Sequence, residues 1–188
     1  MRLAFLALRS ILYASGLVWL WAWVAASLRR FDGLLGGPLP AWSGSLGFVV
    51  LPLGAILAAW CIGAFLLQGH GTLAHFDPPA RLVAVGPYRR VRNPMYLGGA
   101  LLLLGFGLLQ RSPSMILFVA AWWSLFHAVV AFYEEPALRA SFGPDYEEYC
   151  RQTPRWIPIL TASTHIGVNR TLGGKQGDTR QTVVLEKQ

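Results

Sequence analysis

The sequence predicts an all-α, polytopic integral membrane protein with about four transmembrane helices. Of its 188 residues, 54% are hydrophobic and only 13% are charged, which is roughly half the charged fraction of a soluble domain. Four apolar segments reach, or nearly reach, the length of about twenty residues that a helix needs to cross the hydrocarbon core. Arginines and tryptophans gather where these segments end, as they do at membrane interfaces.

The first apolar segment runs from about Leu3 to Leu28, and Arg9 lies close enough to its end to snorkel. It continues without a small-residue cleavage signal, so we expect a retained membrane helix rather than a signal peptide. The second segment runs from about Leu46 to Leu67. Pro52 lies early in it and is expected to kink the helix, because proline removes a backbone donor.

The third segment runs from about Tyr96 to Leu109, and the fourth from about Pro113 to Tyr133. Only three residues join them, so the two are predicted to form an antiparallel hairpin. The third segment is short for a full span. We expect it to be extended, tilted or thinly embedded at its Arg-rich end.

The distribution of arginine predicts the orientation in the membrane. Four crossings place both termini on one side, and that side holds most of the arginines of the apolar region: Arg2, Arg9, Arg81, Arg89, Arg90, Arg92, Arg139, Arg151 and Arg155, against Arg29, Arg30 and Arg111 on the other. This excess predicts that both termini are cytoplasmic. The Arg29–Arg30 pair keeps the opposite orientation open as the alternative.

The net charge of +7 does not indicate a nucleic-acid binding protein. The arginines lie beside apolar segments and form no solvated basic face, which favours anionic headgroups or an anionic cofactor as partners. Cys61 and Cys150 lie far apart and are expected to be reduced thiols. Residues 1–160 are predicted to form one membrane domain, and residues 161–188, which lack an apolar period, a disordered polar tail.

A first polar segment, Gly86 to Gly99, lies between apolar segments and ends in the start of the third helix. A proline suits the first turn of that helix, and the free amides and dipole of the turn suit an anion such as a carboxylate. Arg92 would add a planar fork for the same anion, and Gly98 would allow close approach. Alternatively, the arginines are membrane anchors and the glycines a helix-packing face.

A second polar segment, Glu134 to Pro136, follows the fourth apolar segment. Carboxylates near membrane depth are costly and are commonly interfacial or functional. His127 precedes Glu134 by about two helical turns, but two ligands without a third are a weak metal site. We expect Glu134 or Glu135 to accept hydrogen bonds from ligand hydroxyls or an ammonium group, with His127 as a neighbour or a packing residue.

The segment after these glutamates contains Tyr146 and Tyr149 at near-helical spacing, then Arg155 and Trp156. It is interpreted either as an interfacial amphipathic segment with an aromatic belt or as a lid that folds back over a site. The loop from Gln68 to Val91 is long for a helix connection, and long ordered loops are frequent functional regions.

From Gly71 to Pro158 the order and spacing of GPYRRVRNPMYLGG and EEPALRASFGPDYEEYCRQTPRWIP resemble the isoprenylcysteine carboxyl methyltransferase family, which is related to the phospholipid N-methyltransferases. The resemblance implies a small helical membrane enzyme that uses S-adenosyl-L-methionine. Together with the residue chemistry above, it gives a set of candidate cofactor-binding residues, with no catalytic residue and no metal assigned: Arg92, Asn93, Tyr96, Leu97, Gly98, His127, Glu134, Glu135, Tyr146 and Tyr149.

One departure from the family pattern concerns the methyl acceptor. The eukaryotic enzymes have histidine where this chain has Asn93, and asparagine cannot carry a proton between pH 5 and 8. The resemblance therefore supports cofactor binding more than it supports a prenylcysteine acceptor.

The predicted function is methyl transfer from S-adenosyl-L-methionine to a lipidic or amphipathic acceptor, a carboxylate or an amine. The cofactor would enter from the cytoplasm and the acceptor sideways from the membrane lipids, between helices. Two alternatives come from other classes of protein: a membrane-embedded NADPH-dependent reductase of the sterol-reductase type, and a non-catalytic membrane scaffold. Binding of S-adenosyl-L-methionine or of NADPH separates the two enzymes, and a scaffold would bind neither.

Overall fold

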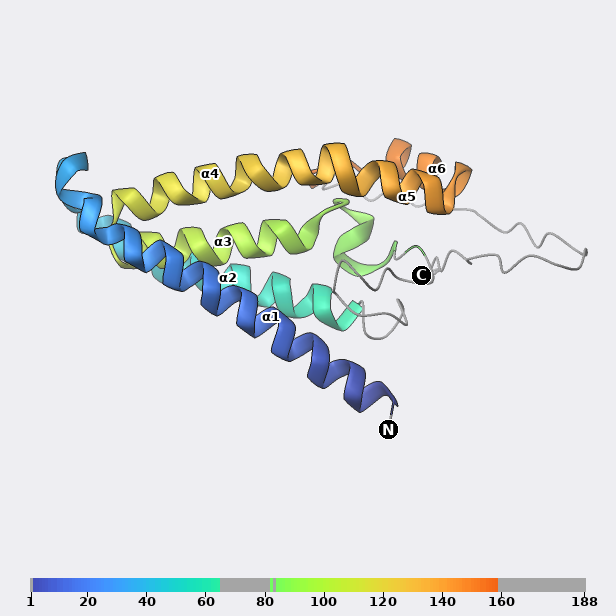
Figure 1. Ribbon diagram of the computed structural model, residues 1–188, viewed down its shortest axis with the longest axis horizontal. Helices are drawn as coiled ribbons and strands as arrows, with labels where there is room; N and C mark the ends of the chain where they lie inside the picture. Colours follow the sequence, from blue (N-terminus) through green and yellow to red (C-terminus); the bar gives the residue numbers. More distant parts are fainter. Residues whose placement is uncertain (1, 65–81, 83, 159–188) are drawn as a thin grey trace, which may run out of the picture.

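The computed structural model describes residues 2–64, 82 and 84–158, and within these ranges all regular secondary structure is helical (Figure 1). The elements, in chain order, are α1 (Arg2–Ser27), the 3₁₀ segment η1 (Leu28–Leu35), α2 (Trp42–Ala64), the 3₁₀ turn η3 (Gly86–Arg89), α3 (Pro94–Leu109), α4 (Pro113–Val129), the π-helical turn η4 (Val130–Glu134), α5 (Glu135–Phe142) and α6 (Pro144–Gln152). The predicted all-α fold is confirmed. Most of the loop from Gln68 and the predicted polar tail lie outside the described residues.

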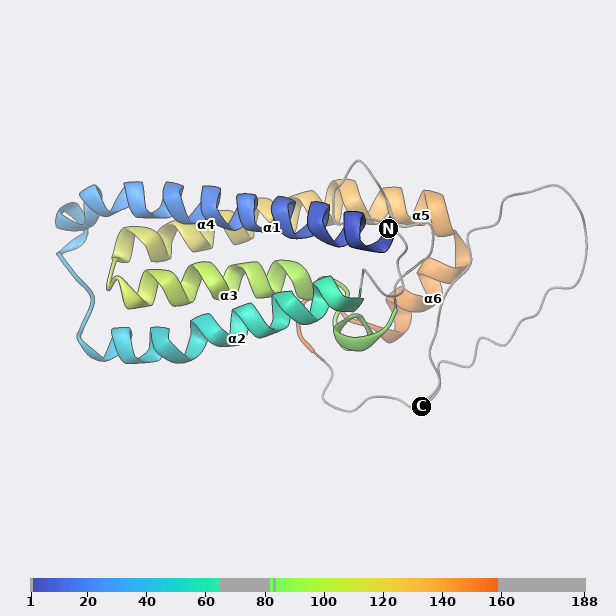
Figure 2. The ribbon, with the colours of Figure 1, turned by 90° about the horizontal axis from the view of Figure 1, so that it is seen from below.

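The helices run up and down along one long axis. In Figures 1 and 2, α1 and α3 run from the end that holds α5 and α6 toward the end that holds η1, and α2 and α4 run back. Both views place α2 along α3. Helix α1 lies near the others at the end that holds η1 and diverges from α4 toward its N-terminus (Figure 1). The predicted hairpin of α3 and α4 is present, and Arg111 in its three-residue turn has a φ of 53°.

Two helix boundaries differ from the sequence prediction. Helix α2 begins at Trp42, about one turn early, because the amides of Ser43 and Gly44 donate to the carbonyls of Pro40 and Ala41 at 3.0 and 3.2 Å. These bonds start the helix before the apolar run begins.

The fourth helical segment was predicted to end at Tyr133, and instead it continues through η4 into α5. At η4 the Glu135 amide donates to the Val130 carbonyl, five residues back. This wider turn fits Pro136, which lacks a donor and whose ring would clash with a carbonyl in a regular α-helix. The paired glutamates therefore lie within one helical rod rather than beyond its end.

Helices α2 and α3 pack closely because glycines line their contact. A Cβ atom on Gly54 would lie 2.6 Å from the Leu102 backbone nitrogen, and one on Gly105 would lie 2.5 Å from the backbone nitrogen of Leu51. Neither position has room for a side chain, since backbone atoms cannot move aside. Small residues at a helix contact are typical of membrane proteins.

At the other end of the bundle, Asp32 links η1 to the start of α4. Its Oδ1 atom accepts hydrogen bonds from the Ser112 hydroxyl at 2.8 Å, from the Ser114 amide at 3.1 Å and from the Ser114 hydroxyl. Burial raises the pKa of Asp32, but these hydrogen bonds outweigh that effect and lower the pKa below its ordinary value. The ionised carboxylate lies at the start of α4, where the helix dipole favours negative charge.

Two described helical segments are long and apolar enough to cross a membrane, Trp42–Ala64 and Pro113–Phe142, and α3 is a shorter apolar helix. Only 17% of the most apolar window of each long segment is buried inside the protein, so neither is the core helix of a soluble domain. Large side chains of α2 face outward, with Phe48 74% and Ile56 64% exposed. Such apolar surfaces match a lipid environment.

Candidate functional site

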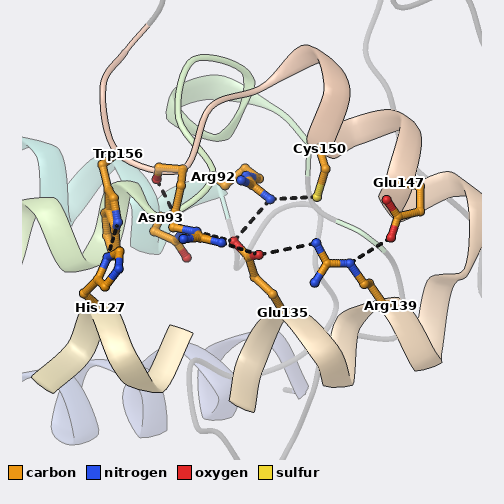
Figure 3. Close-up of polar contacts among 9 residues, drawn as sticks. Arg92, Asn93, His127, Glu135, Arg139, Glu147, Cys150 and Trp156 are labelled. Carbon is orange, nitrogen blue, oxygen red and sulfur yellow. Dashed lines mark hydrogen bonds and ion pairs between the residues drawn. The ribbon is translucent and has the colours of Figure 1, made fainter. Parts of the chain in front are cut away.

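The two polar segments singled out in the sequence meet where α3 begins and where η4 joins α5. The Tyr96 hydroxyl of α3 donates to Oε1 of Glu134. One turn before, Arg92 Nη1 lies 3.2 Å from Glu135 Oε1 (Figure 3). Antiparallel packing of α3 and α4 makes this possible, because it brings the start of one helix beside the end of the other.

The backbone before α3 sets the positions of Arg92 and Asn93. The Arg92 amide donates to the Pro154 carbonyl at 2.9 Å. The Asn93 side chain donates to the Arg155 carbonyl at 3.3 Å, and Figure 3 marks this bond by the dashed line from Asn93. Asn93 therefore does not cap α3 with its side chain. The segment around Pro154 lies against the start of the helix and fixes its direction.

Glu135 is the buried centre of a charge cluster whose arginines range from 12% to 42% exposed. It is 1% exposed, and Arg155 donates to both of its oxygens at 2.7 and 2.9 Å. Arg92 and Arg139 approach the same carboxylate at 3.2 and 3.6 Å (Figure 3). Three arginines from three segments thus surround Glu135, and a fork of this kind is among the strongest hydrogen-bonded ion pairs.

Positive charge exceeds negative charge in this cluster. Of the three arginines, Arg139 has a second described carboxylate, Glu147, at 2.8 Å. Arg92 donates from Nη1 to the Cys150 sulfur at 2.7 Å, and its buried Nε has no hydrogen-bond partner among the described residues. Buried donors are almost always paired in proteins, so this guanidinium nitrogen is a donor left available to an anion.

Tyr146 and Tyr149 belong to a small hydrophobic core. Tyr146 is 2% exposed, and both rings pack with Leu82, Ala84 and Phe142. The Tyr149 hydroxyl donates to the Tyr88 carbonyl at 2.6 Å, which ties α6 to η3. Burial raises the pKa of both phenols, so they stay neutral. Their packing role is defined by these contacts, and their contact with a cofactor stays a prediction.

His127 and Glu134 have different partners. His127 is exposed, and its Nδ1 accepts a hydrogen bond from Trp156 Nε1 at 2.9 Å (Figure 3). The π-helical turn η4 lies between His127 and Glu134 and adds a residue to the turn, so the α-helical spacing that put both on one face does not apply. In the described ranges no group of three metal-ligating side chains is placed to hold an ion.

Leu97 and Gly98 lie in the first turns of α3, next to the polar contacts. Gly98 is buried, and a Cβ atom there would lie 3.1 Å from the Ala58 backbone nitrogen of α2. Its neighbour Leu97 is half-buried. Gly98 therefore contacts α2, as the packing interpretation expects, and its contact with a cofactor stays a prediction.

Sequence reasoning missed the other arginines of the cluster. Arg139 follows Glu135 by four residues, and this spacing is a known signal for a helical ion pair. Arg155 lies twenty residues from Glu135, and no local spacing rule predicts that contact. No local spacing rule predicts the hydrogen bond from Trp156 to His127 either.

Similarity to known proteins defines the family of this chain. Residues 42–145, more than half of the chain, match the family model described as phospholipid methyltransferase. The solved structure of the eukaryotic intramembrane Ras methyltransferase ICMT shares the fold, with a TM-score of 0.50 and 23% identity over 78% of this chain and 53% of that one. The chain is thus similar to helical membrane methyltransferases of the isoprenylcysteine type. It belongs to the phospholipid methyltransferase family.

The similar curated proteins include both a metal-resistance protein and isoprenylcysteine O-methyltransferases. The cobalt-zinc-cadmium resistance protein CzcN of Cupriavidus metallidurans is 30% identical over 132 residues, which are 70% of this chain and 55% of the relative. The protein-S-isoprenylcysteine O-methyltransferase of Schizosaccharomyces pombe is 32% identical over 111 residues, 53% of this chain and 47% of the relative. A probable enzyme of the same name from Oryza sativa subsp. japonica is 30% identical over 92 residues, 48% of each chain. The chain spans about half the length of these relatives.

Proposed function

We propose that this protein transfers a methyl group from S-adenosyl-L-methionine to a lipidic or amphipathic acceptor at the cytoplasmic face of a membrane. The observation that carries the proposal is the meeting of two polar segments at one end of an apolar bundle, through Tyr96 with Glu134 and Arg92 with Glu135. Membership of the phospholipid methyltransferase family supports methyl transfer as the reaction. Relatives named as isoprenylcysteine O-methyltransferases support a lipid-like acceptor.

Arg92 is the proposed partner of the cofactor's carboxylate. Its Nε is buried and unpaired among the described residues, and the side chain is 12% exposed. A carboxylate there would offset the surplus positive charge around Glu135 and would also meet the first-turn amides of α3. Asn93 and Leu97 adjoin this position in the chain.

Glu134 is the proposed partner of the cofactor's ammonium group or ribose hydroxyls. Glu135 is less suited to this role, because three arginines already surround its oxygens. Tyr96 bonds to Glu134 and is the tyrosine best placed to face the adenine or the sulfonium. Tyr146 and Tyr149 support the site from the adjoining core.

The reaction that the cofactor supplies is an in-line displacement at a sulfonium carbon. The residues of this chain are then required to align the partners and to exclude water rather than to exchange many protons. A carboxylate acceptor needs no base, whereas an amine acceptor must be neutral. A carboxylate acceptor therefore does not require a titrating group, and Asn93, which stands where the eukaryotic enzymes have histidine, cannot titrate.

Cofactor affinity is expected to fall about ten- to a hundred-fold in Arg92→Ala and in Glu134→Gln, since each loses a charge-assisted bond worth on the order of 1.5–3 kcal/mol. Calorimetry with S-adenosyl-L-methionine and its demethylated product, on purified and folded protein, measures this loss. Glu147→Gln is the matched control and should bind as the parent does, because Glu147 is 51% exposed and pairs with Arg139. Unchanged affinity in both site variants would place the cofactor elsewhere, and binding of NADPH alone would favour the reductase.

The site is expected to face the cytoplasm, because the arginine excess lies at that end of the bundle. Ser141 on α5 and Leu34 on η1 are exposed at opposite ends. With Cys61→Ala and Cys150→Ser as background, Ser141→Cys should react with an impermeant maleimide only in permeabilised cells. Leu34→Cys should react in intact cells. The reverse pattern would invert the proposed topology.

A further inference from the structure

Trp122 of α4 carries a buried donor that the protein does not use. The side chain is 6% exposed, and its indole Nε1 has no hydrogen-bond partner in the described part of the chain. Leaving such a donor unpaired costs about 1–3 kcal/mol, and most buried donors have a partner. An unpaired indole N–H of this kind points to a ligand atom that accepts a hydrogen bond.

An aromatic cluster surrounds Trp122 on the side of α1 and α3. Its ring centroid lies 4.3 Å from that of Phe126 and 6.4 Å from that of Trp21, which packs onto the cluster from α1. On the α3 side the indole lies against the backbone of Gly99, where a Cβ atom would be in van der Waals contact, 3.4 Å from Trp122 Cη2. The indole is therefore enclosed by apolar rings from two helices and by glycine backbone from a third.

Tyr96 connects this cluster to the proposed cofactor site. Its ring centroid lies 5.2 Å from Phe126 and 6.4 Å from Trp122, and its hydroxyl donates to Glu134. Trp122 is thus one aromatic ring away from the residues proposed to hold the methyl donor. Along α4, Trp122 lies one turn before Phe126, farther than Phe126 from the glutamates that follow this helix.

We propose that Trp122 binds the polar oxygen of the methyl acceptor, with the acceptor's apolar chain against the rings of Trp21 and Phe126. This inference rests on the proposed function and narrows it. An indole N–H can only donate a hydrogen bond, so it selects a group with an oxygen lone pair, such as a carboxylate, hydroxyl or carbonyl. A protonated alkylammonium group offers only donors and is rejected, because the indole N–H would stay unpaired beside it. An amine could pair with the indole only in its neutral form.

Equilibrium binding of tritiated palmitate to the full-length protein in phosphatidylcholine nanodiscs tests this selection. Hexadecanol should compete with palmitate. Hexadecylamine has the same chain length but is protonated at neutral pH, and it should not compete. Trp122→Phe keeps an aromatic ring but removes the donor, and it should weaken palmitate binding about tenfold. Trp23→Phe is the matched control with unchanged binding, because Trp23 is 59% exposed on α1.

Binding of the demethylated cofactor product is measured on the same samples. A Trp122→Phe protein that binds this product as the parent does, and palmitate as tightly as the parent, would overturn the role of Trp122. Equal competition by hexadecylamine, or no palmitate binding by the parent, would also overturn it, and both results are independent of any variant. If the parent binds palmitate with the predicted selection but not the cofactor product, the oxygen site stands and the methyltransferase proposal fails.

Discussion

Glu135→Gln is expected to lower the free energy of unfolding by about 3–5 kcal/mol, because it leaves arginines facing a neutral amide in a buried site. Glu135 is 1% exposed, and it is the carboxylate on which Arg92 and Arg155 converge. Removing one partner of such a cluster costs more than the pair itself contributes, since the remaining charges keep their desolvation penalty. The melting temperature of the purified protein should fall by roughly 6–20 °C.

Two glutamates supply the controls for this experiment. Glu148 pairs with Arg151 at the protein surface, so Glu148→Gln should melt as the parent does. Glu134→Gln keeps an acceptor for the Tyr96 hydroxyl and should lose cofactor affinity without losing stability. A Glu135→Gln protein with the parent's melting temperature would show that the cluster contributes nothing to folding.

Gly105→Leu is expected to separate α2 from α3 and to destabilise the bundle by about 3 kcal/mol or more, at the upper end of overpacking effects. A Cβ atom at this position would lie 2.5 Å from the Leu51 nitrogen and 2.6 Å from Leu51 Cα. Both are backbone atoms of a helix, so the strain cannot be relieved by rotating a side chain. Gly105→Ala should lower stability less, by about 1–3 kcal/mol.

Gly63 of α2 is the matched control. Among the described residues a Cβ atom there would meet nothing within 4 Å, so Gly63→Ala should leave the melting temperature unchanged or raise it slightly through helix propensity. Thermal melting of the variants, in the same detergent, gives the comparison. Equal melting temperatures for Gly105→Leu and the parent would contradict the close contact of α2 and α3.

The helices and the meeting of the polar segments could be predicted because their signals are local. Apolar run length indicates a membrane helix, and a three-residue connection such as that after Leu109 forces a hairpin. That hairpin then brings Arg92 beside Glu135. The crossings of the first and third segments and the cytoplasmic orientation stay predictions, as do the roles of the candidate site residues.

Two kinds of feature could not be predicted: the continuation of the fourth helix past Pro136, and contacts between segments that are far apart in the chain. The helix was expected to end before Glu134 because apolar character ends there, but the π-helical turn lets the backbone pass Pro136. Arg155 reaches Glu135 from a segment whose local sequence indicates only an interfacial chain. The packing neighbours of Gly98 and Gly99, Ala58 and Trp122, likewise belong to other helices and could not be predicted from the local sequence.

The Arg155–Glu135 ion pair also has a consequence for biosynthesis. The two residues are twenty positions apart, so about 1–4 s of translation separate them at about 5–20 residues per second. Before Arg155 is added, only Arg92 and Arg139 of the three arginines are available to Glu135, and the start of α3 lacks the Pro154 carbonyl that receives the Arg92 amide. The polar end of the bundle therefore assembles last, after every described apolar helix has been made. A ribosome that stops before Arg155 would release a set of membrane helices without a completed site.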